Sequence, residues 1–143
     1  MAEIHHELIR ASAGTGKTYQ LTNRYLRILF LTQEPEKIIA LTFTRKAAGE
    51  FFEKIFRRLA DAAESPASAK RLGNELGLSL TAEDCLNALR LLLARLHQLQ
   101  LSTYDSFFSR IVQTFPFELG LAGAPALLDE DQQLRAIERA ELL

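Results

Sequence analysis

The stretch A-S-A-G-T-G-K-T, residues 11–18, decides the fold, because it stands between a short apolar run and a long amphipathic segment. Gly14 and Gly16 carry no side chain, so their backbone can adopt angles closed to other residues and turn successive N–H groups towards an anion. A helix is expected to follow directly, and its unsatisfied N–H groups and positive dipole end would face the same anion. The pattern therefore predicts a phosphate-binding loop.

The predicted loop suits ATP with Mg²⁺. Lys17 would contact the β- and γ-phosphates, and the hydroxyl of Thr18 would reach the magnesium ion. Ala11 stands where the pattern G-x-x-x-x-G-K-[ST] has its first glycine, but a small residue still lets the chain leave a strand without crowding the loop. A glycine-rich turn that binds nothing is the alternative. We predict that the cofactor is bound by Ala11, Ser12, Ala13, Gly14, Thr15, Gly16, Lys17 and Thr18.

Composition indicates one globular domain of 143 residues with enough apolar content, 48%, to form a core. The single cysteine, Cys85, excludes an internal disulfide and is expected to be a buried, inert thiol. No segment has the uninterrupted apolar length of a membrane span and no secretory leader is visible, so we expect a cytoplasmic protein without a membrane partner.

The charges are distributed unevenly. Residues 1–58 carry 10 Lys and Arg against 6 Asp and Glu, whereas residues 59–143 carry 7 against 12. The basic excess lies on the half that contains the phosphate loop, the Arg45-Lys46 pair and the group Lys54, Arg57 and Arg58. Phosphate-rich ligands would favour this half, although such a group is also common on a solvated helix face.

Hydrophobic periodicity predicts an α/β fold with a parallel sheet. A short strand over 7–11 would deliver the loop, and the run over 37–43, rich in β-branched residues, is typical of a strand buried on both faces. Strand, loop, helix and strand form a βαβ unit, with the loop at the carboxyl edge of the sheet. The helix that starts at Gly16 has an apolar stripe made of Leu21, Tyr25, Ile28, Leu29 and Thr32.

Further elements are expected downstream. A second helix buries Ala48, Phe51, Phe52, Ile55 and Leu59, and a short helix over 69–76 ends at Gly77. Thr81 would cap a leucine-rich helix whose buried stripe is Leu86, Leu89, Leu93 and Leu96, with Leu92 beside it. A strand over 99–103 precedes a helix capped by Asp105 that stops at Pro116, and a final helix begins near Asp129 after a flexible connection.

Two further motifs follow the loop: L-T-F-T-R-K-A-A, residues 41–48, and S-T-Y-D-S-F, residues 102–107. Each ends a predicted strand and begins a helix. With these three motifs in this order, the chain resembles the N-terminal part of the superfamily 1 DNA helicases of the UvrD/Rep type. It is most similar to the helicase-nuclease branch that includes AddA and the RecB exonuclease subunit, and the resemblance spans essentially the whole chain.

The resemblance implies a partial RecA-like P-loop NTPase domain over residues 1–119 and the start of an inserted helical subdomain over residues 120–143. It implies ATP-dependent translocation along single-stranded DNA and unwinding of duplex DNA in repair or recombination, with ATP and Mg²⁺ as cofactors. A second helicase-nuclease subunit is a possible partner. Lys17 would act as the catalytic cation and Thr18 as the magnesium contact. The implied DNA contacts are Thr42, Phe43, Thr44, Lys46 and Thr103.

Other parts of such an enzyme have no credible match in the sequence, including a carboxylate pair, an arginine finger and a nuclease centre. The segment Asp129-Glu130-Asp131-Gln132 is similar to a metal-binding motif of these helicases, but no buried strand precedes it, so we expect a helix start there. We therefore expect an N-terminal fragment of a longer protein that is inactive by itself. The alternatives are a small-molecule P-loop kinase and a non-catalytic interaction module on a degenerate helicase fold.

Overall fold

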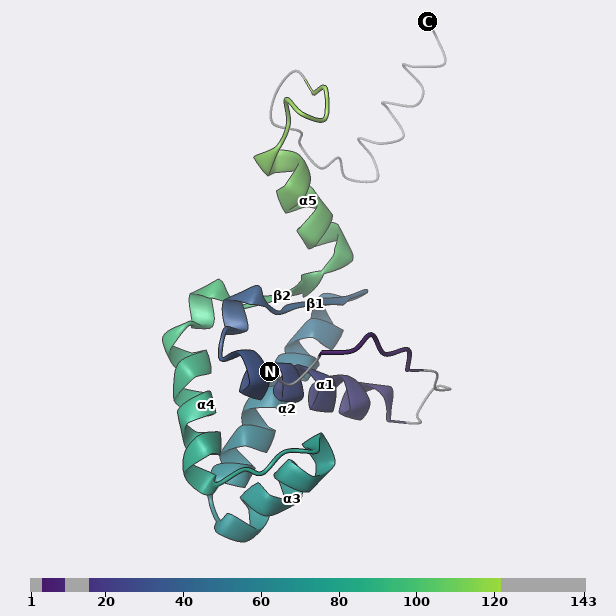
Figure 1. Cartoon of the computed structure of the whole chain (residues 1–143). Helices are drawn as coiled ribbons and strands as arrows, with labels where there is room; N and C mark the ends of the chain where they lie inside the picture. Colours follow the sequence, from purple (N-terminus) through teal and green to yellow (C-terminus); the bar gives the residue numbers. More distant parts are fainter. Residues whose placement is uncertain (1–3, 10–15, 122–143) are drawn as a thin grey trace, which may run out of the picture. The chain divides into compact units, whose positions relative to one another are not determined.

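The computed structural model describes residues 4–9 and 16–121 in two compact units, Met1–Thr103 and Tyr104–Leu143 (Figure 1). Most of the predicted phosphate loop, residues 10–15, lies outside the described residues. The first unit contains helix α1 Lys17–Thr32, 3-10 turn η1 Pro35–Lys37, strand β1 Ile39–Thr42, helices α2 Arg45–Ala63, α3 Pro66–Leu76 and α4 Ala82–Ala94, 3-10 turn η2 Leu96–Gln98 and strand β2 Gln100–Thr103. The second unit contains helix α5, Tyr104–Thr114.

The strands β1 and β2 pair in parallel, with a register that runs from Ile39 opposite Gln100 to Thr42 opposite Thr103. Helices α2, α3 and α4 form the connection between them, so the mixed helix and parallel-sheet class is confirmed. The expected burial of the 37–43 strand on both faces is wrong, since Ile39 is 54% exposed and the rest of β1 is half-buried. Within the described part of the chain, β1 also has a neighbouring strand on one edge only.

Helix α2 is the centre of the first unit: it packs against α1, α3, α4 and both strands. Its buried face consists of Phe51, Ile55, Leu59 and Ala62, which confirms most of the predicted stripe. The ring of Phe51 meets that of Tyr25 on α1 edge-on, with centroids 5.9 Å apart. This shared core fixes α1 against α2.

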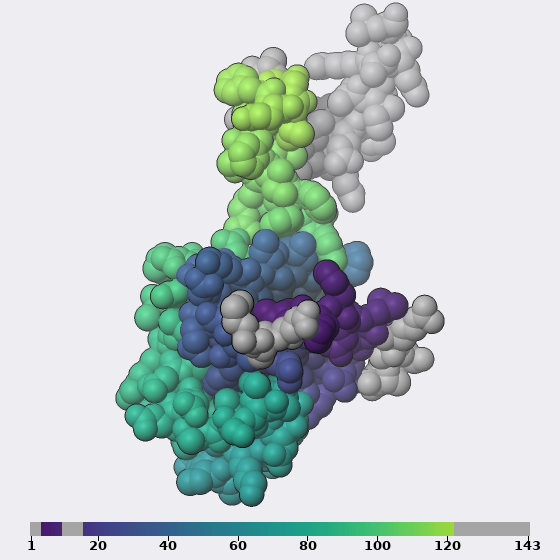
Figure 2. Space-filling view, in the orientation of Figure 1, coloured from purple at the N-terminus to yellow at the C-terminus, as the bar shows by residue number. Residues whose placement is uncertain are grey.

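The strand expected over 7–11 is not observed in its described part, because residues 4–9 have no regular secondary structure. The segment lies over α1 instead, as the purple atoms in Figure 2 show. Arg24 of α1 donates a hydrogen bond to the backbone carbonyl of His5 and forms an ion pair of 3.7 Å with Glu7. The described part of this segment is therefore held by the Arg24 side chain and not by pairing with a neighbouring strand.

Of the stripe predicted for α1, Tyr25 and Leu29 are buried, and Ile28 and Thr32 are half-buried. Leu21 is 51% exposed, whereas Thr22 and Leu26 are buried beside Tyr25 and Leu29. The hydroxyl of Thr22 donates to the carbonyl of Thr18 at 2.7 Å, so this polar side chain can face the core with its hydrogen bond made.

The predicted leucine stripe of α4 is wrong at three of its four positions, since only Leu89 packs against the core, half-buried. Leu86, Leu93 and Leu96 are exposed, and the residues that α4 buries are Cys85, Ala88 and Leu92. The small Cys85 and Ala88 face the neighbouring helices, where α4 packs against α2 and α3, and large side chains would hold the helices further apart. Cys85 is fully buried, as expected, and burial raises the pKa of its thiol.

The predicted helix ends are confirmed where the signals are local. Gly77 follows α3 in the left-handed conformation, with φ 66°, and its N–H returns to the last turn of the helix. The Thr81 hydroxyl accepts from the N–H of Asp84, and the Asp84 carboxylate accepts from the N–H of Thr81 at 2.8 Å, which is a capping box.

In the second unit, α5 starts at Tyr104, two residues earlier than a cap at Asp105 implies. Asp105 therefore lies inside the first turn, where its charge faces the positive end of the helix dipole, and not at the cap position. The helix ends before Pro116, as expected. The predicted helix near Asp129, and nearly all of the expected subdomain over residues 120–143, lie outside the described residues.

Candidate functional site

Among the described residues, Gly16 and Lys17 at the amino end of α1 are exposed. Gly16 precedes the helix with φ 83° and ψ 19°, a backbone conformation that only glycine adopts readily. A Cβ atom at this position would meet nothing within 4 Å, so the backbone angle, not the space, requires glycine. Among the described residues no side chain caps the helix, and its first turn has no acidic residue, so the N–H groups at this end can receive an anion without a competing carboxylate.

Lys17 and Thr18 occupy the first two positions of α1; Lys17 is exposed and Thr18 is half-buried. This end therefore combines N–H groups, the positive end of a 16-residue helix and a lysine cation. These groups fit the phosphates of ATP, and a threonine hydroxyl is a suitable contact for Mg²⁺. The predicted contacts from Ala11 to Thr15 lie outside the described residues.

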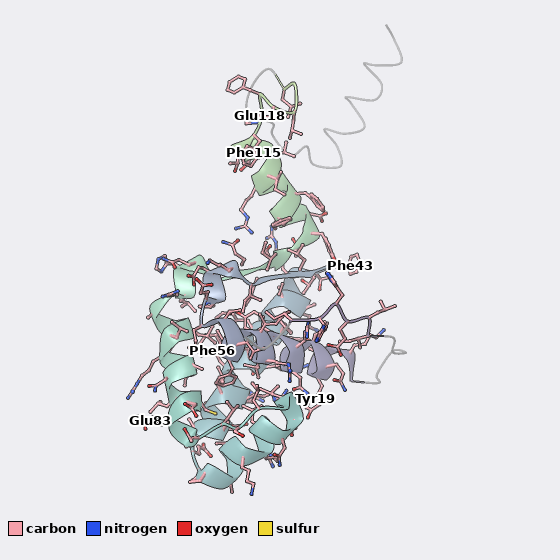
Figure 3. The ribbon with its side chains drawn as sticks, viewed as in Figure 1. Tyr19, Phe43, Phe56, Glu83, Phe115 and Glu118 are labelled. Atoms are coloured by element: carbon pink, nitrogen blue, oxygen red, sulfur yellow. The ribbon has the colours of Figure 1, made fainter. Side chains whose placement is uncertain are left out.

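The second motif forms a tight corner between β1 and α2. The hydroxyl of Thr42 donates to the carbonyl of Thr44 at 2.9 Å, and the hydroxyl of Thr44 accepts from the N–H of Ala47 at 3.1 Å as the cap of α2. These two bonds fix the backbone on both sides of Phe43. The Phe43 side chain points away from the sheet with 88% of its surface exposed, as Figure 3 shows at the end of β1.

The hydroxyls of Thr42 and Thr44 differ in whether they can donate a hydrogen bond to a phosphate. Thr42 already donates its proton, whereas Thr44 is an acceptor and keeps its own proton to donate. Lys46 follows in the first turn of α2 with its side chain 87% exposed, 4.0 Å from the carboxylate of Glu50. The corner therefore presents an aromatic face, a hydroxyl donor and a cation together.

Parallel pairing brings the second and third motifs to one edge of the sheet. Thr103, the last residue of β2, lies opposite Thr42, the last residue of β1, although the two are far apart in the sequence. Thr103 is only 7% exposed, which makes it the least exposed of the five predicted DNA contacts. The carboxyl end of β1 and the first turn of α1 lie on the same side of the first unit in Figure 1.

Sequence reasoning missed a cluster beside the first turn of α1. Arg58 of α2 lies over the ring of Tyr19 and contacts Asn23 and Glu75. From the sequence we expected Lys54, Arg57 and Arg58 to form one basic group. In the structure the two arginines differ in exposure: the Arg58 side chain is 18% exposed and that of Arg57 is 69% exposed. The only signal in the sequence was that Arg58 stands next to the buried Leu59.

Two kinds of site are absent from the part of the chain that the structure describes. No group of three or more His, Cys, Asp or Glu side chains is arranged to hold a metal ion. None of the described helices has both the length and the apolar composition needed to cross a membrane.

Comparison with known proteins agrees with the family resemblance seen in the sequence. The profile of the UvrD/REP helicase N-terminal domain matches residues 3–141. The chain is 30% identical over 132 residues to an ATP-dependent helicase/nuclease subunit from Streptococcus suis (strain 98HAH33), and the match covers 92% of this chain and 10% of the relative.

Two other relatives extend this result. An ATP-dependent helicase/nuclease subunit from Latilactobacillus sakei subsp. sakei (strain 23K) is 31% identical over 95% of this chain and 15% of its own length. The RecBCD enzyme subunit RecB of Haemophilus influenzae is 44% identical over 38% of this chain and 5% of its own length. The chain thus spans only a small part of these relatives, and no solved structure matches it. Because the profile matches nearly the whole chain, this protein belongs to the UvrD/REP helicase N-terminal domain family.

Proposed function

We propose that this chain is the N-terminal ATP-binding part of an ATP-dependent DNA helicase of the helicase-nuclease type, which acts in DNA repair or recombination. The observation that carries the proposal is the amino end of α1, where a positive-φ Gly16 leads into Lys17 and Thr18 with no acid in the first turn and no capping side chain among the described residues. Family membership and the relatives' names as ATP-dependent helicase/nuclease subunits support the same function.

The nucleotide would bind with its phosphates on the loop 11–18. Lys17 would hold the phosphate oxygens and neutralise the charge that develops on them in the transition state. Thr18 would hold Mg²⁺, which, when bound with ATP, supplies electrostatic activation of the phosphate. The remaining loop residues would contribute backbone N–H groups as anion donors. Catalysis by the intact protein also needs groups outside the described residues, so this part alone would bind nucleotide weakly and turn it over poorly.

Single-stranded DNA would bind at the corner between β1 and α2. Phe43 would stack on a base, Thr44 would donate to a phosphate oxygen, and Lys46 would add positive charge. Thr42 holds the corner through its bond to Thr44, and Thr103 lies directly behind it in the neighbouring strand. Stacking does not distinguish bases, which suits movement along any sequence. A second helicase-nuclease subunit is the proposed protein partner, in line with the relatives' description as subunits.

The test is DNA-stimulated ATP hydrolysis by the intact protein that contains this chain. Lys17→Ala is expected to abolish stimulated turnover, because it removes the cation at the phosphates. Lys70→Ala is the matched control, since Lys70 is an exposed lysine on α3, away from the site, and its removal should leave turnover unchanged. Unchanged stimulated turnover in Lys17→Ala would refute the proposal. ATP consumption that requires a small acceptor and ignores DNA would point to a kinase.

A further inference from the structure

Arg58 is the centre of a polar cluster that joins three helices. Its guanidinium carbon lies 4.7 Å from the ring centroid of Tyr19 on α1. One guanidinium nitrogen donates to the side-chain oxygen of Asn23, also on α1, and the other donates to the carboxylate of Glu75 on α3. Tyr19 and Asn23 are one turn apart, so both lie on the same face of α1.

The cluster contacts the first turn of α1, which does not pack into the hydrophobic core. The first buried residue of α1 is Thr22, and none of the residues from Lys17 to Leu21 is buried. Tyr19, labelled in Figure 3, is 45% exposed. It lines a surface hollow together with Arg58 and residues of α3. The contact with Arg58 therefore ties the first turn of α1 to α2, two residues after Lys17.

The chemistry of the cluster requires arginine. A planar guanidinium can stack on a ring with its face while its edge donates to two different acceptors. A lysine ammonium at the same place is a point charge with a different donor geometry, so it would not reproduce the stacked face and the two bonds together. Glu75 compensates the charge of the arginine, whose side chain is 18% exposed against 31% for Glu75. The cluster is thus a satisfied, partly shielded network and not a ligand pocket.

We propose that Arg58 is a positioning residue for the nucleotide reaction: through Tyr19 and Asn23 it fixes the first turn of α1, and with it the backbone N–H groups and Lys17 that face the phosphates. This inference rests on the proposed ATP-binding function. A helix end that is held in place before the ligand arrives loses less freedom on binding, so nucleotide affinity should depend on the cluster.

The experiment measures nucleotide affinity, kcat and KM for ATP, and thermal unfolding of the intact protein without DNA, for four variants. Arg58→Gln removes the stacked charge, and Tyr19→Leu removes the ring at a half-exposed position where folding is not at risk. Tyr19→Phe keeps the ring face. Arg57→Gln is the matched control, because Arg57 is the neighbouring arginine, with an exposed ion pair to Glu53 on its own helix.

We expect Tyr19→Leu to weaken nucleotide binding about two- to fivefold, the effect of losing an exposed cation–π contact. Arg58→Gln should weaken it about tenfold, since hydrogen bonds are lost as well. Both should raise KM more than they lower kcat, while Tyr19→Phe and Arg57→Gln should bind nucleotide like the wild type. Equal affinity in Tyr19→Leu and Arg57→Gln, whatever happens to the unfolding temperature, would overturn the positioning role. Absence of ATP binding in the wild-type protein would instead overturn the proposed function.

Discussion

Replacing Phe43 by alanine tests whether this residue contacts DNA or packs in the core. The ring is 88% exposed, so its removal leaves no cavity, and the free energy of unfolding should change by less than about 0.5 kcal/mol. Stacking of an aromatic ring on a base contributes roughly 1–3 kcal/mol, which corresponds to about 5- to 150-fold in affinity. Phe43→Ala should therefore weaken single-stranded DNA binding by that factor and leave nucleotide binding unchanged.

The assay is fluorescence anisotropy of a labelled oligothymidine titrated with the intact protein over a range of salt concentrations. Phe43→Ala removes no phosphate contact, so the dependence of log affinity on log salt should keep its slope. Lys46→Ala should reduce the magnitude of that slope by about 0.7, because one cation no longer displaces counterions from the single strand. The two variants thus report on stacking and on charge separately.

The control for folding is Phe51→Ala. Phe51 is 6% exposed and packs edge-on against Tyr25, so its truncation should cost about 3–5 kcal/mol of stability. If Phe43→Ala instead destabilised the protein by about 2 kcal/mol or more and bound DNA like the wild type, Phe43 would be a packing residue and the reasoning would be refuted.

Three further predictions concern stability. Leu92→Ala should cost about 2–5 kcal/mol in denaturant unfolding, whereas Leu93→Ala, on the exposed face of α4, should cost less than about 0.5 kcal/mol; equal losses would contradict the observed stripe. Hydrogen bonds from the hydroxyl and the N–H of Thr81 lower the pKa of Asp84, so its contribution is present above the unfolded pKa and lost as pH falls through the folded one. The stability difference between wild type and Asp84→Asn should therefore be largest above about pH 5 and shrink in acid, and a difference independent of pH would argue against the capping charge. Gly77→Ala should destabilise by about 1 kcal/mol in the same assay because φ is 66°, and a neutral effect would be inconsistent with the left-handed turn.

The sequence alone was sufficient where the cause lies within a few residues. Thr81 and Asp84 are three positions apart and cap α4 as predicted, and Gly77 ends α3 because no other residue adopts its backbone angle as easily. The second and third motifs lie between a strand and a helix, as predicted, and the order of the three motifs led to the family that the comparisons confirm. The nucleotide and DNA contacts assigned to them remain predictions.

Tertiary structure decided what depends on residues far apart in the chain. Hydrophobic periodicity allows α4 to bury either its leucines or the Cys85 and Ala88 face, and only the approach of α2 selected the small residues. Arg57 and Arg58 are adjacent arginines, yet Arg58 has its partners on α1 and α3, whereas Arg57 pairs with Glu53 on its own helix. The pairing of Thr42 with Thr103 joins two motifs in the same way. Local pattern fixes which elements form, whereas their rotation and partners depend on packing that only the folded chain provides.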